Sequence, residues 1–508
     1  MFPNDTDSDT KVTLETEATP IAEDLPFHIL LLGDWSGRES HQTNSDSLNL
    51  HPIEIDRDNF DEVIKNLRVR LDLDFQGNGE SILSLSFTEL EDFHPDKIFQ
   101  QLPLFANLRD VRRRLLNKES YNQAAQEVCS WLSVEDNAEE TEIKSQTVSQ
   151  ESNQSSTGNI LDQILSHSAE NVSPSQNQNV EKSELSAFIG KLIEPHLIKT
   201  DVAEQSELLM IIDEVISDLM RKILHHPHFQ KLESAWRGLY LLVRKSETDV
   251  DLKLFLLDAT KHELASNLKS VNDLSDSYFY NPLAEASEPW AAICGNYTFG
   301  LNVDDVAVLM RLAKLGKTAN APFISYIQPE MFGFNSFDIS SGHEAWHFAE
   351  DSIEGKLWNT LRSVSEADYL GLALPRFLAR LPYGEKTDPT EMFYFEEFKE
   401  AIKHEQYLWG NPTFICALLL AQSYRRFGWN MTQNLVLDLD DLPVHLYQED
   451  NETKTKPCAE IVMTQANSEK LLGQGLMPLI SYRNDDRVRL GRIQSVAFPF
   501  SNLNGKWS

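Results

Sequence analysis

A helix and a strand follow one another directly within residues 224–264, and their boundaries are marked in the sequence. Pro227 suits the first turn of a helix, and residues 252–259 are a nearly unbroken apolar run of strand length, typical of a strand buried on both faces. Thr260 and Glu263 have the spacing of a capping box, which predicts that another helix begins there. One wide apolar helical face is expected from residues spaced by three and four, namely Leu232, Ala235, Trp236, Leu239, Tyr240 and Val243.

The rest of this half continues the alternation of helices and strands. The most apolar helix is expected at residues 208–223. Further strands are predicted at 290–298, 322–327 and 369–374, and further helices at 303–318 and 413–427. This alternation predicts an α/β (α+β) fold with mixed sheets flanked by helices.

The first part of the chain has the same mixed character. Residues 27–32 read as a buried strand that ends in the turn GDWSGR, which has neither the spacing of a nucleophilic serine elbow nor that of a dinucleotide loop, so a structural turn at a sheet edge is expected. Asp58 is expected to cap a helix that ends near Val69. A hairpin at 71–87 and a helical segment at 94–132 follow.

Composition supplies the expected boundaries. Residues 1–24 are acidic and polar and are expected to be a disordered tail without a signal peptide. Residues 25–133 form the first domain. Residues 134–185 are a linker rich in Ser, Gln and Asn, with one short helix at 159–170. Residues 186–508 form the second domain.

Charge and cysteine content exclude several classes of function. The net charge of −34 disfavours binding to nucleic acid or anionic lipid, and no apolar run is long enough to cross a bilayer. The nearest basic run, RDVRRR at 109–114, is predicted to be a solvated helix face. The four cysteines are far apart, which predicts reduced thiols rather than disulfides or a zinc site. We expect a soluble cytoplasmic protein with no cofactor.

Five phrases in the second half resemble one protein family, in the same order. They are HHPHFQKLESAWRGLYLLV (225–243), EPWAAICGNYTFG (288–300), YLGLALPRFLARLPYG (369–384), YLWGNPTF (407–414) and GLMPLISYRNDD (475–486). They are similar to the large subunit of the type VI secretion contractile sheath, the family called TssC, VipB, ImpC or EvpB. Residues 26–132, with PFHILLLGDWSG at their start, resemble the small sheath subunit, TssB or VipA. The chain thus resembles a natural fusion of the two.

The resemblance implies a structural component of a type VI secretion apparatus that works through protein–protein interfaces. Its implied partners are other sheath subunits or copies of itself, the inner tube protein, the baseplate and an AAA+ disassembly ATPase. In the family a further segment follows the last phrase and links neighbouring subunits; here Ser508 ends the chain soon after that phrase, so an accessory paralogue at a sheath end or baseplate is an alternative to a wall subunit.

The helix expected at 159–170 resembles the segment that the ATPase recognises. Its apolar face consists of Ile160, Leu161, Ile164 and Leu165. A transient helix, or an anchor on the chain's own surface, is the competing interpretation.

A competing class of function is a zinc metalloprotease. His343, Glu344 and His347 form a literal H-E-x-x-H, in which two histidines on one helix face bind Zn²⁺ and the glutamate polarises its water. Polar neighbours and the lack of a recognisable third ligand favour a surface helix instead. Two weaker patterns are interpreted as structural, the LGKT at 315–318 within a predicted helix and the acidic cluster at 438–452, which reads as a solvated strand edge.

Overall fold

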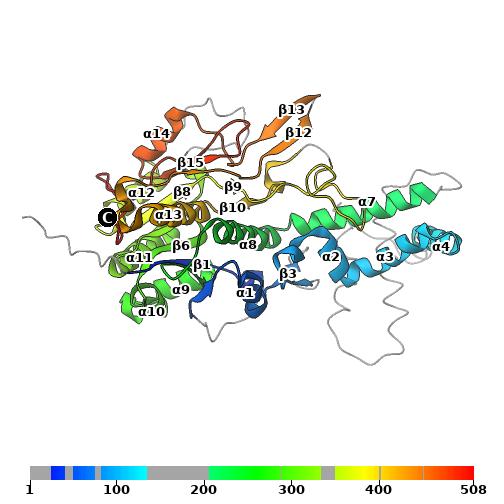
Figure 1. The fold of residues 1–508 in the computed structure, drawn as a ribbon, viewed down its shortest axis with the longest axis horizontal. Coiled ribbons are helices and arrows are strands. Elements are labelled where there is room, and N and C mark those ends of the chain that lie inside the picture. Colours follow the sequence, from blue (N-terminus) through cyan, green and yellow to red (C-terminus); the bar gives the residue numbers. More distant parts are fainter. Residues whose placement is uncertain are drawn as a thin grey trace, which may run out of the picture.

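The computed structural model describes residues 25–40, 50–74, 82–133, 205–286, 288–332, 349–399, 402–449 and 451–507. Below, the N-terminal part means residues 25–133 and the C-terminal part means residues 205–507. Figure 1 shows a broad sheet-containing body at one end, from which a helical arm extends along the long axis.

A nine-stranded mixed sheet forms the centre of the body, in the order β11-β15-β14-β8-β7-β6-β1-β5-β2. From β14 to β5 the neighbouring strands are parallel, whereas β2, β15 and β11 pair antiparallel. The strands are β1 (Phe27–Gly33), β2 (Ile53–Ile55), β5 (Leu252–Asp258), β6 (Trp290–Phe299), β7 (Phe323–Ile327), β8 (Leu370–Leu374), β11 (Asp438–Leu439), β14 (Met477–Ser481) and β15 (Val488–Leu490).

Strand β1, from the N-terminal part, lies inside this sheet between two strands of the C-terminal part. It pairs parallel with β5, with Phe27 opposite Leu252 and Gly33 opposite Asp258, and parallel with β6 on its other side. All seven of its residues are buried. Because burying each large aliphatic side chain stabilises by roughly 1.5–3 kcal/mol, β1 contributes strongly to the union of the two parts.

Helices cover both faces of the sheet and create two cores. Residues Ile29 and Leu31 of β1 belong to one core, whereas Leu30 and Leu32 belong to the other. The first core includes α8 (Pro227–Lys245) and α13 (Thr413–Phe427), and the second includes α9 (Lys261–Ser270), α10 (Tyr280–Ala284), α11 (Val303–Ala319) and α12 (Ile353–Ser363). Both cores therefore depend on the N-terminal part.

The helical arm combines the two parts as well. Helix α7 (Gln205–Leu224) packs against α3 (Pro103–Leu116) and α4 (Tyr121–Ser133). The N-terminal part also contains α1 (Phe60–Leu67), the hairpin of β3 (Arg70–Asp74) and β4 (Ile82–Ser86), and α2 (Pro95–Gln101), with 3-10 turns η1 (Arg38–Ser40) and η2 (Leu90–Phe93).

Smaller elements of the C-terminal part lie around the sheet. They are the pair β9 (Phe377–Leu378) and β10 (Trp409–Gly410), the hairpin β12 (His445–Glu449) and β13 (Glu452–Lys456), helix α14 (Gln465–Gly473), and 3-10 turns η4 (Leu274–Asp276), η5 (Pro329–Phe332), η7 (Ala367–Tyr369), η8 (His404–Gln406) and η9 (Gly428–Gln433).

The predicted fold class is confirmed, a mixed sheet flanked by helices. Pro227 opens α8, and Thr260 and Glu263 form the expected capping box of α9. Three local predictions were wrong. Tyr240 is 39% exposed rather than part of the buried face of α8, and α1 is preceded by Asn59 rather than capped by Asp58. The turn after β1 follows an interior strand of the sheet rather than an edge strand, because β1 pairs on both sides.

Candidate functional site at the junction of the two parts

The turn that follows β1 is attached to the end of the neighbouring strand β5. The carboxylate of Asp258 accepts hydrogen bonds from the backbone N–H of Trp35 at 2.8 Å and from Oγ of Ser36 at 2.6 Å. Arg38 donates to the carbonyl of Asp258 at 2.7 Å and pairs with Glu263 at 3.1 Å. The GDWSGR sequence is therefore a joint between the two parts.

Backbone geometry explains the second glycine of this turn. Gly37 has a φ of +82°, a conformation that costs glycine little and other residues more, and a Cβ there would collide with the carbonyl oxygen of Arg70. Asp34 accepts hydrogen bonds from the backbone N–H groups of Arg38 at 2.7 Å and Glu39 at 2.8 Å, which holds η1 in place. Burial raises the pKa of Asp34 despite these bonds.

Two tryptophans connect the turn to helix α8. The indole Nε1 of Trp236 donates to the carbonyl of Trp35 at 3.0 Å, and their rings meet edge to face with centroids 5.7 Å apart. Both side chains are fully buried. Gly238, on the same helix, has the ring of Phe414 against its backbone, so a larger residue would push α8 away from α13.

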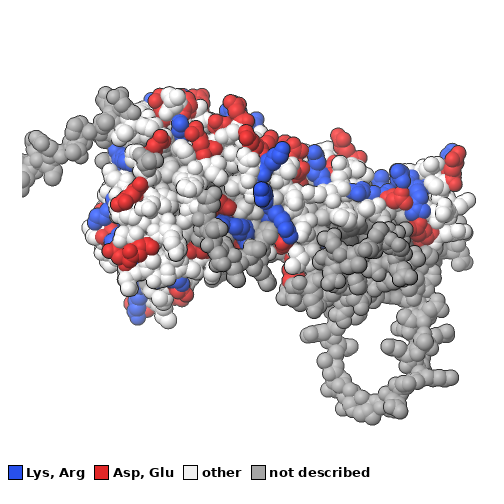
Figure 2. Space-filling view, turned by 90° about the horizontal axis from the view of Figure 1, so that it is seen from below, with Lys and Arg blue, Asp and Glu red and all other residues white. Residues whose placement is uncertain are grey.

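The arm carries polar contacts between the parts. Arg112 of α3 forms two hydrogen bonds with Asp213 of α7, at 2.6 and 3.2 Å. Nearer the body, Asp96 accepts from the backbone N–H groups of Glu391 at 2.8 Å and Met392 at 3.2 Å. Figure 2 shows acidic and basic side chains close together at the arm end of the molecule, in agreement with such pairing.

A buried ionic network joins α8 to the segment that follows β9. Arg380 pairs with Glu233 and Glu397, each at 2.7 Å, and Arg237 donates to Glu233 at 2.7 Å. Burial alone would raise the pKa of Glu397, but the charge of Arg380 and the hydrogen bond from His225 outweigh it and lower the pKa to about 2. The carboxylate therefore stays ionised inside the protein.

A second network is centred on Glu460, whose side chain is fully buried. Arg376 Nε donates to it at 3.0 Å and His404 Nε2 lies 2.9 Å from it. Burial opposes ionisation, yet Arg376 and His404 lower the pKa of Glu460 to about 2. Lys456, at the base of the β12–β13 hairpin, lies 3.1 Å from the other ring nitrogen of His404.

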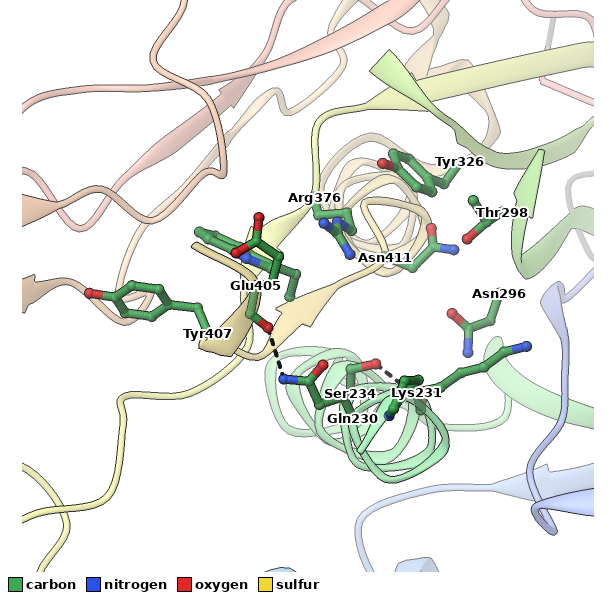
Figure 3. A pocket seen from close by; sticks show the side chains of 12 residues that line it. Gln230, Lys231, Ser234, Asn296, Thr298, Tyr326, Arg376, Glu405, Tyr407 and Asn411 are labelled. Carbon is green, nitrogen blue, oxygen red and sulfur yellow. Dashed lines mark hydrogen bonds between the residues drawn. The ribbon is translucent and has the colours of Figure 1, made fainter. Parts of the chain in front are cut away.

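A cavity of about 380 Å³, the rim cavity, opens between α8 and the carboxyl ends of β6 and β7. Helix α8 contributes Gln230, Lys231 and Ser234, and β6 contributes Asn296 and Thr298. Figure 3 shows these side chains around one common space. The carboxyl end of parallel strands is where ligands bind in open α/β sheets.

The opposite wall of the rim cavity combines charge with aromatic rings. It is formed by Tyr326, Arg376, Glu405, Trp409 and Asn411. Arg376 points toward the cavity in Figure 3, and Asn411 is fixed by a 3.1 Å hydrogen bond to the carbonyl of Tyr297. The lining is suited to holding a polar group by hydrogen bonds.

The structure does not test the two predicted sites, the H-E-x-x-H motif and the helix that resembles the ATPase-recognition segment. His343, Glu344 and His347 lie in 333–348, and Ile160, Leu161, Ile164 and Leu165 lie in 134–204, both outside the described residues. Within the described ranges, no group of three or more His, Cys, Asp or Glu side chains is arranged to hold a metal. No helix in the same ranges is long and apolar enough to span a membrane.

The weaker patterns can be placed more fully. The LGKT sequence lies within α11, as predicted. The RDVRRR run lies within α3, but of its charged residues only Arg113 is exposed, and Arg112 contacts Asp213 of α7, so the predicted solvated face is only partly confirmed. In the acidic cluster, Asp438 pairs with Arg489 at 2.8 Å, Asp441 with Lys245 at 3.1 Å and Glu449 with Lys454 at 2.5 Å. Cys294, Cys416 and Cys458 are buried free thiols.

Sequence reasoning missed the ionic networks and the rim cavity. Glu233 has a helical position among apolar residues, which is the one local signal that it is buried, but its partner Arg380 is 147 residues away. Nothing in one sequence pairs such distant charges.

Two family models match the chain, one for each part. The model described as "EvpB/VC_A0108, tail sheath N-terminal domain" matches residues 206–497, more than half of the chain, and the model "Type VI secretion system, VipA, VC_A0107 or Hcp2" matches residues 10–147. A relative is the type VI secretion system sheath protein TssC1 of Pseudomonas aeruginosa, 33% identical over 316 residues, which are 60% of this chain and 64% of the relative. The chain belongs to the type VI secretion sheath family and joins a VipA-like and an EvpB-like region in one polypeptide.

Proposed function

We propose that this protein is a structural sheath component of a type VI secretion apparatus, a fused unit that works by contacting other sheath subunits or copies of itself. It transforms no substrate in this proposal. The family supports the structural role, and the buried ionic network of the C-terminal part serves the fold, because its charged groups are paired with one another.

The observation that carries the proposal is the position of β1. A strand of the VipA-like region lies between two strands of the EvpB-like region, so the two regions form one folded body. Joining them covalently fixes their ratio at one to one. Such a body suits a repeating unit of an assembly, in which every copy must carry the same complete set of surfaces.

The proposal includes further partners that the family resemblance implies. These are the inner tube protein, the baseplate and an AAA+ disassembly ATPase, the last through Ile160, Leu161, Ile164 and Leu165. It also includes a cytoplasmic location. The chain spans 64% of the length of the TssC1 relative that it matches. The proposal covers both a wall subunit and an accessory paralogue at a sheath end or baseplate.

Electron microscopy of the full-length protein, expressed alone and together with the tube protein, tests the proposal. Helical tubes would identify a wall subunit. Small complexes with sheath subunits or with copies of itself would identify an accessory component. A strictly monomeric protein that binds no sheath subunit would overturn the structural role.

A further inference from the structure

We propose that the rim cavity is a socket for an acidic side chain of a second copy of this chain. Lys231 binds the incoming carboxylate. In the isolated chain Lys231 instead forms an ion pair with Glu39 of the same copy. This inference rests on the proposed function, because it describes how copies contact one another.

The cavity has the size and the donors that a carboxylate side chain needs. Its volume of about 380 Å³ is large enough for a whole side chain, and its lining carries two positive charges, from Lys231 and Arg376, against one negative charge from Glu405. Among the described residues, the side chains of Asn296 and Thr298 have no hydrogen-bonding partner, so an amide and a hydroxyl at the cavity are available to an incoming group. A carboxylate accepts hydrogen bonds from lysine, amide and hydroxyl donors alike.

The two cations differ in how firmly they are held. Arg376 is bound to Glu460, which is fully buried, so releasing it would leave an unpaired charge in the interior. Lys231 pairs instead with Glu39, and these side chains are 49% and 38% exposed. Because ion pairs between exposed side chains contribute little to stability, Lys231 can exchange Glu39 for another carboxylate at little cost. Lys231 is therefore the cation that an incoming carboxylate can capture.

The charge of the chain identifies the occupant. With 79 acidic and 45 basic residues, copies repel one another at a distance, so a contact between them is favoured where a basic group of one copy meets an acidic group of the other. A helical assembly uses heterologous contacts, in which one patch of a copy meets a different patch of the next. A cationic socket on one copy and an acidic surface on another meet that requirement.

The two residues of the Lys231–Glu39 pair have opposite predicted effects. Lys231→Gln removes the binding group and should weaken self-association of the full-length protein, measured by sedimentation equilibrium at low salt, by on the order of tenfold. Glu39→Gln removes the competitor and should strengthen it. An ion pair that only stabilises the fold would shift self-association in the same direction in both variants, or in neither.

Matched controls come from a similarly exposed pair that joins Lys97 of α2 to Glu89, the residue before η2. Lys97 and Glu89 lie 3.0 Å apart, with side chains 46% and 42% exposed, and Lys97→Gln and Glu89→Gln should leave self-association unchanged. Equal urea midpoints for all four variants would show that folding is intact. Added salt should weaken the wild-type contact more than the contact of the Lys231→Gln variant.

The possible failures are distinguishable. If the wild-type protein self-associates and neither Lys231→Gln nor Glu39→Gln changes its affinity, the socket is wrong and the proposed function stands. If an unrelated acidic protein binds with the same dependence on Lys231, the second copy is the wrong occupant. If the wild-type protein neither self-associates nor binds sheath subunits, the proposed function fails as well.

Discussion

Arg380 and Glu233 form an ion pair in the interior of the protein, with Nε of the guanidinium 2.7 Å from the carboxylate and side chains that are 8% and 0% exposed. Glu233 lies on α8, whereas Arg380 follows β9, so the pair ties the helix that packs on Trp35 to the segment after β9. Buried charges are tolerated because their partners are fixed, and losing Glu233 leaves Arg380 with Glu397 alone and takes away the carboxylate that Arg237 pairs with.

Glu233→Gln should therefore destabilise the protein by about 3–5 kcal/mol, the range expected when one partner of a buried pair is removed. The variant keeps the size of the side chain, so the loss reports charge rather than packing. The measurement is the urea midpoint followed by tryptophan fluorescence.

Glu54→Gln is the matched control for that substitution. Glu54 pairs with Lys253 at 3.2 Å, but its side chain is 46% exposed, so the expected loss is below about 1 kcal/mol. Similar losses of unfolding free energy for Glu233→Gln and Glu54→Gln would show that the buried ion pair stabilises the protein no more than the exposed one.

Glu397 predicts how stability depends on pH. Its pKa is about 2 in the folded protein against an ordinary value of 4.5, so the unfolded chain binds a proton that the folded protein does not as the pH falls below 4.5. The stabilisation is complete above that pH and is lost as the pH falls toward 2. Urea unfolding at a series of pH values should show a shallower acid-side decline for Glu397→Gln than for wild type.

The exposed Glu391→Gln variant is the control for this pH series and should decline as steeply as wild type. Other carboxylates contribute to acid unfolding, so the difference between the variant and wild type carries the test. Parallel curves for Glu397→Gln and wild type would mean that Glu397 does not contribute to the acid-side decline.

Cutting the chain between the two parts should not separate them. A protease recognition sequence placed within residues 134–204 allows cleavage after folding. Because β1 lies between β5 and β6 and supplies both cores, the two fragments should co-elute in native buffer and part only in denaturant. Fragments that separate in native buffer would refute the shared sheet.

The H-E-x-x-H sequence should have no role in catalysis. Purified protein is expected to hold no stoichiometric zinc, and His343→Ala should leave self-association unchanged, because the proposed function needs no metal there. Metal analysis and a peptide hydrolysis assay check this prediction. Zinc together with hydrolysis that His343→Ala abolishes would establish the enzyme instead.

Sequence patterns predicted local structure well and spatial pairing poorly. The helix–strand–capping box order of residues 227–263 was confirmed, since each signal acts within a few residues. The strand at 27–32 was also predicted, but its place between β5 and β6 was not. The sequence of an apolar strand does not indicate which other strands pair with it. Tyr240 shows the same limit, since helical spacing alone does not distinguish the border of a buried face from its centre.

The rim cavity illustrates the limit for a site. Asn296 lies on a largely buried strand and Lys231 lies on a helix, so each has an ordinary local context. They line one cavity only because α8 packs near the carboxyl end of β6. Arg376, which lines the same cavity, was part of a family phrase but carried no sign of its bond to Glu460, 84 residues later.

The central claim is that this protein works by contacting its own kind. Two full-length copies with different affinity tags, expressed in one cell and purified through one tag only, test it most directly. We predict that the second tag is recovered with the first and that the amount falls in the Lys231→Gln variant. Recovery of the first tag alone, with no related sheath subunit bound to it, would contradict the claim.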